Sequence, residues 1–300
     1  MSITFTHKIK TLGYTTAALI AFAANSVLCR MALSDDAIDP ASFTVLRLLS
    51  GSAIFVVIFA FKSHNSTLIS TSRDGSWLSP LMLFLYALTF SFAYVSLDTG
   101  TGALVLFGAV QLTMIISSVI NGNRLHISEW LGMSMAFIGL VYLVYPTVTT
   151  PSISGFILMV ISGVAWGIYS LIGRSSKHPL RDTACNFKRT IPLIAILALA
   201  TMPTMTLSSD GIILAVISGA LASGVGYSIW YVALSGLSVT EAAVVQLSVP
   251  VIAAVGGLLF VFEPITARLI YSAILMLGGI LIVVLGRYYF VISREKTDHN

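Results

Sequence analysis

The chain has 300 residues, of which 57% are hydrophobic and 9% are charged, and its formal net charge is +4. Its mean hydropathy is +0.95. Soluble domains carry about 25% charged residues, so this composition excludes a water-soluble domain and predicts a protein surrounded mainly by lipid. The small positive charge is expected to mark loops on one side of a membrane, not a nucleic-acid partner.

Ten apolar segments follow one another along the chain, separated by short polar connectors. About 20 apolar residues in a helix cross a bilayer with every backbone group bonded within the helix. The expected spans are residues 11–33, 40–61, 78–97, 101–120, 127–146, 153–173, 184–203, 211–233, 239–262 and 267–291. The sequence therefore predicts an all-α integral membrane protein that forms one bundle of ten transmembrane helices.

The first segment has a second interpretation. Lys8 and Lys10 precede an apolar run that ends near Cys29, a pattern that cleaved signal peptides share. A lipoprotein site needs a small residue before the cysteine, whereas Leu28 stands there, and nine further spans follow. We expect a retained helix, with Cys29 and Cys185 as buried apolar side chains within spans and no disulfide framework.

Charge in the connectors predicts the orientation. Basic residues concentrate in cytoplasmic loops, and alternate loops here carry most of them: Lys8, Lys10, Lys62, Arg73, Arg124, Arg174, Lys177, Arg181, Arg287, Arg294 and Lys296. The opposite loops carry mostly acids: Asp35, Asp36, Asp39, Asp98, Asp210 and Glu263. Both termini are therefore expected in the cytoplasm, at a bacterial inner membrane.

The two halves of the chain resemble each other. Phe22 stands eight residues before Arg30, as Trp166 stands eight before Arg174, and seven residues separate Pro40 from Arg47 and Asp182 from Arg189. We expect an N-terminal repeat at residues 1–148 and a C-terminal repeat at residues 149–300. Five helices in each repeat give the halves opposite orientations, an arrangement typical of carriers.

These features also resemble a known family. The paired aromatic and basic residues, the Pro40 to Arg47 spacing, Thr240-x-Ala242 before Pro250, Glu263 and Gly278-Gly279 are similar to the EamA family of the drug/metabolite transporter superfamily. The resemblance implies a ten-helix basket with a central cavity, with the fifth and tenth helices peripheral. It also implies export of amino acids, other metabolites or toxic compounds, or uptake of small solutes.

The first half departs from the family pattern at three positions. Gln111 replaces a proline, Asn123 replaces an acid, and Phe22 replaces a tryptophan. The first half is thus the less typical one, which leaves open whether both halves contribute equally to a site.

Charged residues within the spans are candidates for function, because a charge in a bilayer is costly. Arg47 lies seven residues into the second span, and Arg189 is its counterpart in the other half. Two guanidiniums facing a cavity favour an anionic solute. The alternative is that the pairs Arg47–Asp98 and Arg189–Glu241 brace helices or act as gates.

Amides and aromatic rings complete the candidate site. Amides in apolar helices either bond between helices or line a wet cavity, and aromatic walls can stack on a solute. The expected substrate-binding residues are Asn25, Arg47, Tyr94, Gln111, Trp166, Tyr169, Arg189, Tyr227 and Gln246, with Asp98 and Glu241 in gating or structural ion pairs.

No motif for a catalytic, metal or nucleotide site is present in the sequence, so we expect a transporter without cofactor or metal, and not an enzyme. The function hypothesis is a secondary transporter that moves a small organic solute, an amino acid or another metabolite, by alternating access, with efflux as the expected direction. Three rivals remain: an intramembrane enzyme, a lipid or nucleotide-sugar carrier of the same fold, and a scaffold or sensor. The expected partners are the solute and the lipid bilayer, and a homodimer is compatible with the sequence.

Overall fold

The computed structural model describes residues 2–34, 36–62, 76–120, 122, 126–145, 152–174, 176, 178–234, 236–237 and 239–287. The described residues fold into helices and contain no β-strand beyond an isolated bridge between Ile38 and Leu207. Eight helical stretches are long and apolar enough to cross a membrane, and Leu78–Tyr94 and Ile127–Leu143 are two shorter apolar helices. The predicted all-α membrane protein with ten spans is confirmed.

The first half contains five helices, each a single span. They are α1 (Ser2–Ser34), α2 (Pro40–Lys62), α3 (Leu78–Tyr94), α4 (Thr99–Ile120) and α5 (Ile127–Val144). Pro40 opens α2, where the missing N–H of proline costs no helical hydrogen bond. The capping box of His126 and Glu129 begins α5.

The second half is more interrupted, because three of its spans change helical geometry. Its elements are α6 (Ile153–Gly173), α7 (Pro179–Arg189), α8 (Ile191–Thr201), the 3₁₀ turn η1 (Met202–Thr204), α9 (Ser209–Ile217), the π-helix η2 (Ser218–Val225), α10 (Gly226–Leu234), α11 (Val239–Gln246), α12 (Val249–Gly256), the π-helix η3 (Gly257–Val261) and α13 (Ala267–Arg287). The seventh span was expected to begin at residue 184, but its polar first helix α7 already begins at Pro179.

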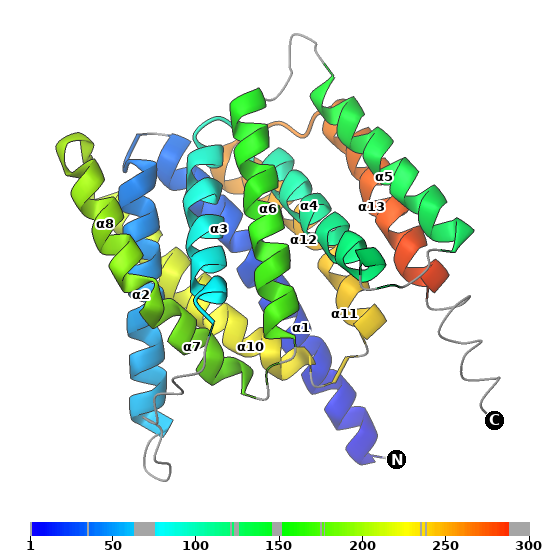
Figure 1. Cartoon of the computed structure of the whole chain (residues 1–300), viewed down its shortest axis with the longest axis horizontal. Helices are drawn as coiled ribbons and strands as arrows, with labels where there is room; N and C mark the ends of the chain where they lie inside the picture. The colour runs from blue at the N-terminus through cyan, green and yellow to red at the C-terminus, as the bar shows by residue number, and fades with distance from the viewer. Residues whose placement is uncertain are drawn as a thin grey trace.

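Helices from the two halves intermix around α1, which packs against α9, η2, α10 and α12 (Figure 1). On one side α3 and α4 pack against α6, and on the other α2 packs against α8, α9 and η2. The pair α5 and α13 lies at the edge of the bundle, as the resemblance implied for the fifth and tenth spans. A Cβ atom at Gly132 would overlap the carbonyl oxygen of Gly279, so this pair approaches backbone to backbone.

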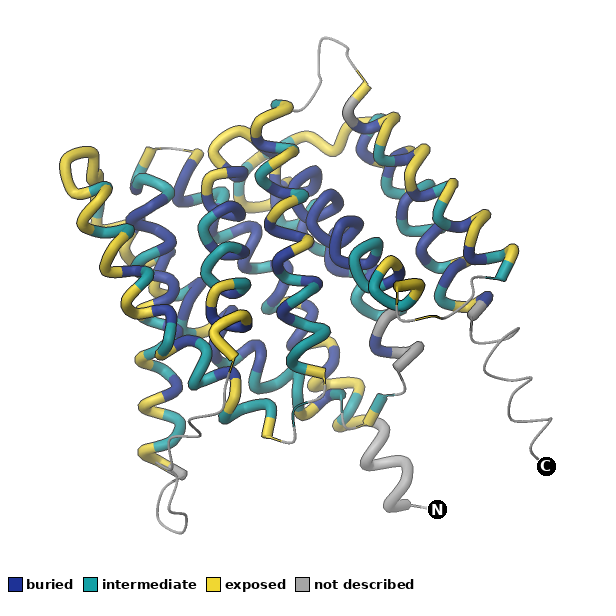
Figure 2. The backbone as a smooth tube through the Cα atoms, viewed as in Figure 1, coloured by how far each residue is buried: buried dark blue, intermediate teal, exposed yellow. Residues whose placement is uncertain are grey.

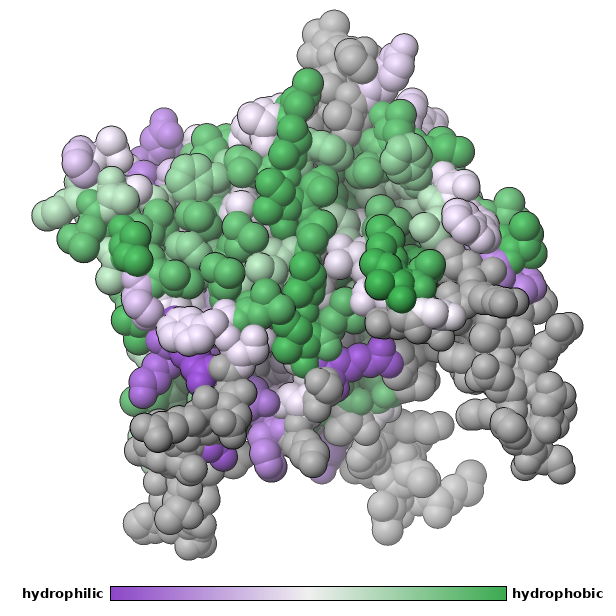
Figure 3. All heavy atoms as spheres, in the orientation of Figure 1, coloured by the Kyte–Doolittle hydropathy of each residue, from purple (hydrophilic) through white to green (hydrophobic). Residues whose placement is uncertain are grey.

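Buried residues concentrate along α1, α3 and α4 in the middle of the bundle, whereas α8 and α5 expose much of their surface (Figure 2). The exposed residues on these outer helices are largely apolar, such as Ile196, Leu199, Leu131 and Phe137. Figure 3 shows hydrophobic residues across the middle of one face and hydrophilic residues toward its lower edge. This distribution fits a bundle surrounded by hydrocarbon, with polar ends in water.

The bundle has two ends that differ in their residues. The turns from α1 to α2, from α3 to α4 and from η3 to α13 meet at one end, which we call the Glu263 end (Figure 1). The last residues of α6 and α10 and the start of α1 lie at the opposite end, which we call the Arg174 end.

Candidate functional site

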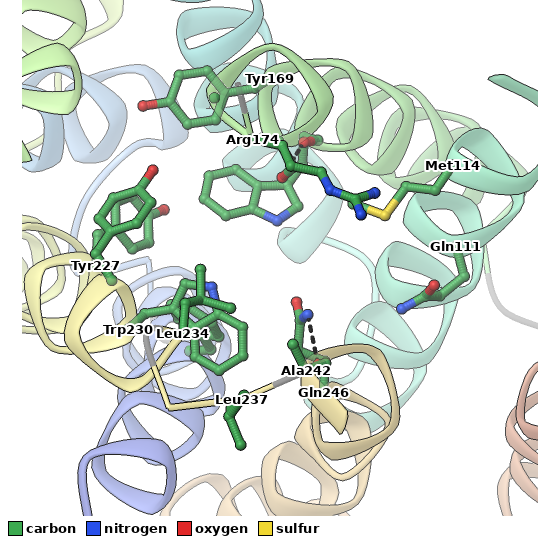
Figure 4. Close-up of a pocket in the computed structure, with 15 residues that line it drawn as sticks. Gln111, Met114, Tyr169, Arg174, Tyr227, Trp230, Leu234, Leu237, Ala242 and Gln246 are labelled. Carbon is green, nitrogen blue, oxygen red and sulfur yellow. Dashed lines mark hydrogen bonds between the residues drawn. The ribbon is translucent and has the colours of Figure 1, made fainter. Parts of the chain in front are cut away.

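A cavity of about 300 Å³ opens at the Arg174 end, between helices of both halves. Its wall comes from α1, α4, α6, α10 and α11, and residues at its mouth include Gly173, Arg174 and Leu237. Figure 4 shows Gln111 of α4 and Gln246 of α11 directed into this space from facing helices. Cavities of this size hold small organic molecules.

Aromatic rings make up six of the fifteen residues that line the cavity. Trp166 stacks on Tyr169 with ring centroids 5.4 Å apart and planes inclined by 30°. Phe22 meets Trp230 edge-on at 5.6 Å, and Tyr227 lies 5.1 Å from Trp166. Such a wall can stack on an apolar or aromatic group, while Gln111, Gln246, Ser170 and Arg174 supply the polar contacts.

A smaller hollow lies deeper in the bundle, beyond Phe22, Trp166 and Tyr227. Its volume is about 20 Å³, and Asn25, Tyr86 and Phe90 are among its walls. The side-chain oxygen of Asn25 accepts hydrogen bonds from Ser218 at 2.8 Å and Ser223 at 3.2 Å, which ties α1 to η2.

Arg47 contacts Tyr86 and Phe90, two residues in the wall of this hollow, and is 1% exposed. Its Nη2 donates to the Tyr86 hydroxyl at 2.9 Å, and its Nε points to the Ser223 hydroxyl at 3.4 Å. The guanidinium also lies over the rings of Tyr86 and Phe90, 5.2 Å and 4.8 Å from their centroids. Its Nη1 has no hydrogen-bond partner among the residues that the structure describes.

An ion-pair network joins several helices at the Glu263 end. Arg30 donates from Nε to Glu263 Oε1 at 2.7 Å and from Nη1 to the Tyr94 carbonyl at 2.9 Å. The second carboxylate oxygen of Glu263 accepts from the backbone N–H of Thr99 at 2.7 Å. The network therefore holds α1, the α3–α4 turn and the η3–α13 turn together at this end of the bundle.

Asp98 belongs to the edge of the same network. Its carboxylate lies 3.8 Å from Arg30 Nη2 and is 60% exposed. Burial and the neighbouring Glu263 carboxylate raise the pKa of Asp98 above its ordinary value, against the opposing effect of Arg30. Arg30 therefore pairs mainly with Glu263, at 2.7 Å, and only secondarily with Asp98.

The structure brings together most of the predicted substrate residues. Five of them line the cavity: Gln111, Trp166, Tyr169, Tyr227 and Gln246. Asn25 lines the deeper hollow. Tyr94 packs instead against Phe90 and directs its hydroxyl to the Thr99 carbonyl, and Arg189 lies over the Trp77 ring at 6.0 Å. Neither residue is part of either wall.

The predicted pair Arg47–Asp98 is wrong, because the partner of Asp98 is Arg30. Arg47 points into the bundle toward Tyr86, whereas Asp98 stands in the turn at its end. The side chain of Glu241 lies outside the described residues, and so does the predicted pair with Arg189.

Sequence reasoning missed the partners of Arg47 and the link between Arg30 and Glu263. Asp98 and Glu263 were both assigned to one side of the membrane, and Arg30 stands near the end of the first expected span on that side, which was the available signal for their pairing. Tyr86 and Ser223 carried no signal, since a tyrosine or serine in an apolar span is common.

A bundle of ten membrane-crossing helices around a solute-sized cavity defines a membrane transporter. The model of the EamA-like transporter family matches residues 10–145 and 153–285. The chain therefore belongs to the EamA-like transporter family.

Several known proteins are similar to the chain. An uncharacterized protein of Pseudomonas aeruginosa is 45% identical over 278 residues, which are 93% of this chain and 96% of that protein. A probable amino-acid metabolite efflux pump of Escherichia coli is 26% identical over 69% of this chain and 78% of its own length. A solved structure, described only as a crystal structure of a protein, superposes with a TM-score of 0.65 at 20% identity, over 92% of this chain and 98% of that one, and supports the fold alone.

Proposed function

We propose that the protein is a secondary transporter that exports a small organic solute, an amino acid or another metabolite, across the inner membrane of a bacterium. The observation that carries the proposal is the asymmetry of the cavity. It opens at the Arg174 end, and the network of Arg30 and Glu263 closes the Glu263 end. A carrier in a state that is open to one side of the membrane has a cavity that opens at one end of the bundle.

The basic residues of the loops support the orientation. Arg174 lines the cavity, and Arg174 and Arg181 belong to the connector between the sixth and seventh expected spans, which the positive-inside rule assigns to the cytoplasm. Both termini then lie in the cytoplasm, and the described state faces inward. A homodimer is compatible with this scheme, and the cycle needs neither a cofactor nor a metal.

Alternating access follows from the repeats, which we propose divide at residues 148 and 149. The cavity wall takes α1 and α4 from the first half, and α6, α10 and α11 from the second. Rocking of one half against the other would open the Glu263 end as the Arg174 end closes. The direction of export is supported by the name of the Escherichia coli relative.

Counterflow in proteoliposomes tests the function. The full chain is reconstituted with an internal pool of one unlabelled solute, and uptake of the labelled solute is followed across a panel of amino acids and metabolites. We expect transient accumulation of at least one solute, and Trp166→Ala should reduce it because the wall loses its central ring. A panel without any accumulation above protein-free liposomes would contradict the proposal and favour a scaffold or sensor.

A further inference from the structure

We propose that Arg47 binds the carboxylate of the transported solute while the aromatic cavity holds the solute's apolar body. This inference rests on the proposed transport function and names its substrate class: a small organic carboxylate with an apolar or aromatic group. In the described part of the chain, no carboxylate pairs with Arg47, and both ion pairs given above belong to Arg30.

A buried guanidinium without a counter-charge is unfavourable in a low-dielectric interior. Tyr86 and Ser223 offer only neutral oxygens to Arg47, and the rings of Tyr86 and Phe90 offer a weaker attraction. An anionic ligand would supply the missing charge. The cost of burying Arg47 in the empty protein then becomes a source of affinity for a carboxylate.

Nη1 of Arg47 is buried and has no acceptor among the described residues, although nearly all buried donors in folded proteins are satisfied. A guanidinium binds a carboxylate through two parallel N–H···O bonds. The free Nη1 is therefore the donor that such a ligand would complete.

Tyr86, which holds Arg47, lies 4.7 Å from Trp166, and Trp166 lines the open cavity. The rings of Tyr86, Trp166 and Tyr227 line the small hollow. Its volume of about 20 Å³ suffices for a single water but not for a solute. Tyr86 and Tyr227 must therefore shift before a carboxylate reaches Arg47.

Such a shift is coupled to the motion of the two halves. The carbonyl of Arg47 packs against Gly219 of η2, where a Cβ atom would overlap it. Any displacement of α2 relative to η2 changes the surroundings of Arg47 directly. The carboxylate is thus engaged in the occluded state, after the solute has entered from the Arg174 end.

Calorimetric titration of the full-length protein in lipid nanodiscs tests the assignment. The probes are 3-phenylpropanoate, L-phenylalanine, L-phenylalaninamide, which lacks the carboxylate, and acetate, which lacks the apolar body. We expect the two aromatic carboxylates to bind, and the amide and acetate to bind at least about tenfold more weakly. Arg47→Met should weaken 3-phenylpropanoate at least about tenfold, while the matched Lys188→Met, which removes an exposed charge, should not change it.

Arg47→Lys separates charge from geometry, since a lysine keeps the charge without the bidentate fork, and it should bind with an intermediate affinity. If Arg47→Met does not fold, Arg47→Lys and the comparison of acid with amide on the unmodified protein still test whether Arg47 binds the carboxylate. Equal binding of the amide, equal binding of acetate as a simple anion, or no binding of either aromatic carboxylate up to ~10 mM overturns the inference.

The transport hypothesis fails separately. Carboxylates that bind through Arg47 but show no counterflow would contradict the transport function and support the carboxylate site at Arg47. Counterflow of the amide at the same rate as the acid would contradict the carboxylate site at Arg47 and support the transport function.

Discussion

Arg30 and Arg47 are two arginines of the same half with opposite surroundings. Arg30 is tied to Glu263 at 2.7 Å, to Asp98 and to two backbone carbonyls. Arg47 is more deeply buried and is bound only to hydroxyls and rings. The comparison separates two kinds of buried charge: a compensated arginine that ties helices together at one end of the bundle, and an uncompensated one that we propose binds the solute.

The largest expected effect is a difference in stability between two matched substitutions. Arg30→Met leaves the Glu263 carboxylate without its cation and should lower the free energy of unfolding by about 2–4 kcal/mol. Arg47→Met removes a charge that lacks a partner and should be neutral or stabilising. Denaturant or thermal unfolding of both variants in the same lipid measures the difference, and equal losses would show that Arg47 is braced as firmly as Arg30.

The next effect concerns the packing on which Arg47 depends. Gly219→Ala places a methyl group against the Arg47 carbonyl and the Ser50 hydroxyl and should cost about 1–3 kcal/mol by overpacking. Gly13→Ala is the matched control, because a Cβ atom there meets nothing within 4 Å. The same unfolding assay compares them. A harmless Gly219→Ala would mean that α2 and η2 do not approach as closely as the structure indicates.

The smallest effect concerns Asp98 and has a defined sign with pH. Burial and Glu263 raise the pKa of Asp98, so the folded state holds this proton more tightly than the unfolded chain. The contribution of Asp98 to stability is therefore full at low pH and declines as pH rises through the raised pKa. Asp98→Asn should remove this dependence and, above that pKa, change stability by less than ~1 kcal/mol.

Unfolding curves of the protein and of Asp98→Asn across a pH series check this prediction. The difference between them should shift in favour of the variant as pH rises. A shift in the other direction would make the pair with Arg30 the dominant influence on Asp98.

The sequence predicted the spans well because apolar length is a local property. The sixth span was expected at residues 153–173, and α6 has these bounds. Mid-span aromatics in the cavity-forming helices were expected as walls, and the rings of Trp166 and Tyr227 lie in a common wall; their contact with a solute stays a prediction. These features need only the depth of a residue in the membrane.

The remaining features depend on the direction in which a side chain points around its helix, and depth does not give this. Arg47 and Asp98 were paired by depth, yet Arg47 faces Tyr86 on the neighbouring α3. The π-helix at Ser218–Val225 is equally hidden in sequence, although it brings Ser218 and Ser223 to Asn25. Both features arise from packing between the halves.

Side-specific labelling of one cysteine tests the central claim that the cavity opens at the Arg174 end and is closed by Arg30 and Glu263. Met114 lines the cavity, so Met114→Cys is made in a chain whose two native cysteines are replaced. A membrane-impermeant maleimide is applied to sealed vesicles of either orientation. We predict rapid labelling from the cytoplasmic side, slow labelling from the other side, and faster labelling from that other side once Glu263→Gln weakens the network. Labelling from the non-cytoplasmic side that is already rapid, or that Glu263→Gln leaves unchanged, would contradict the account.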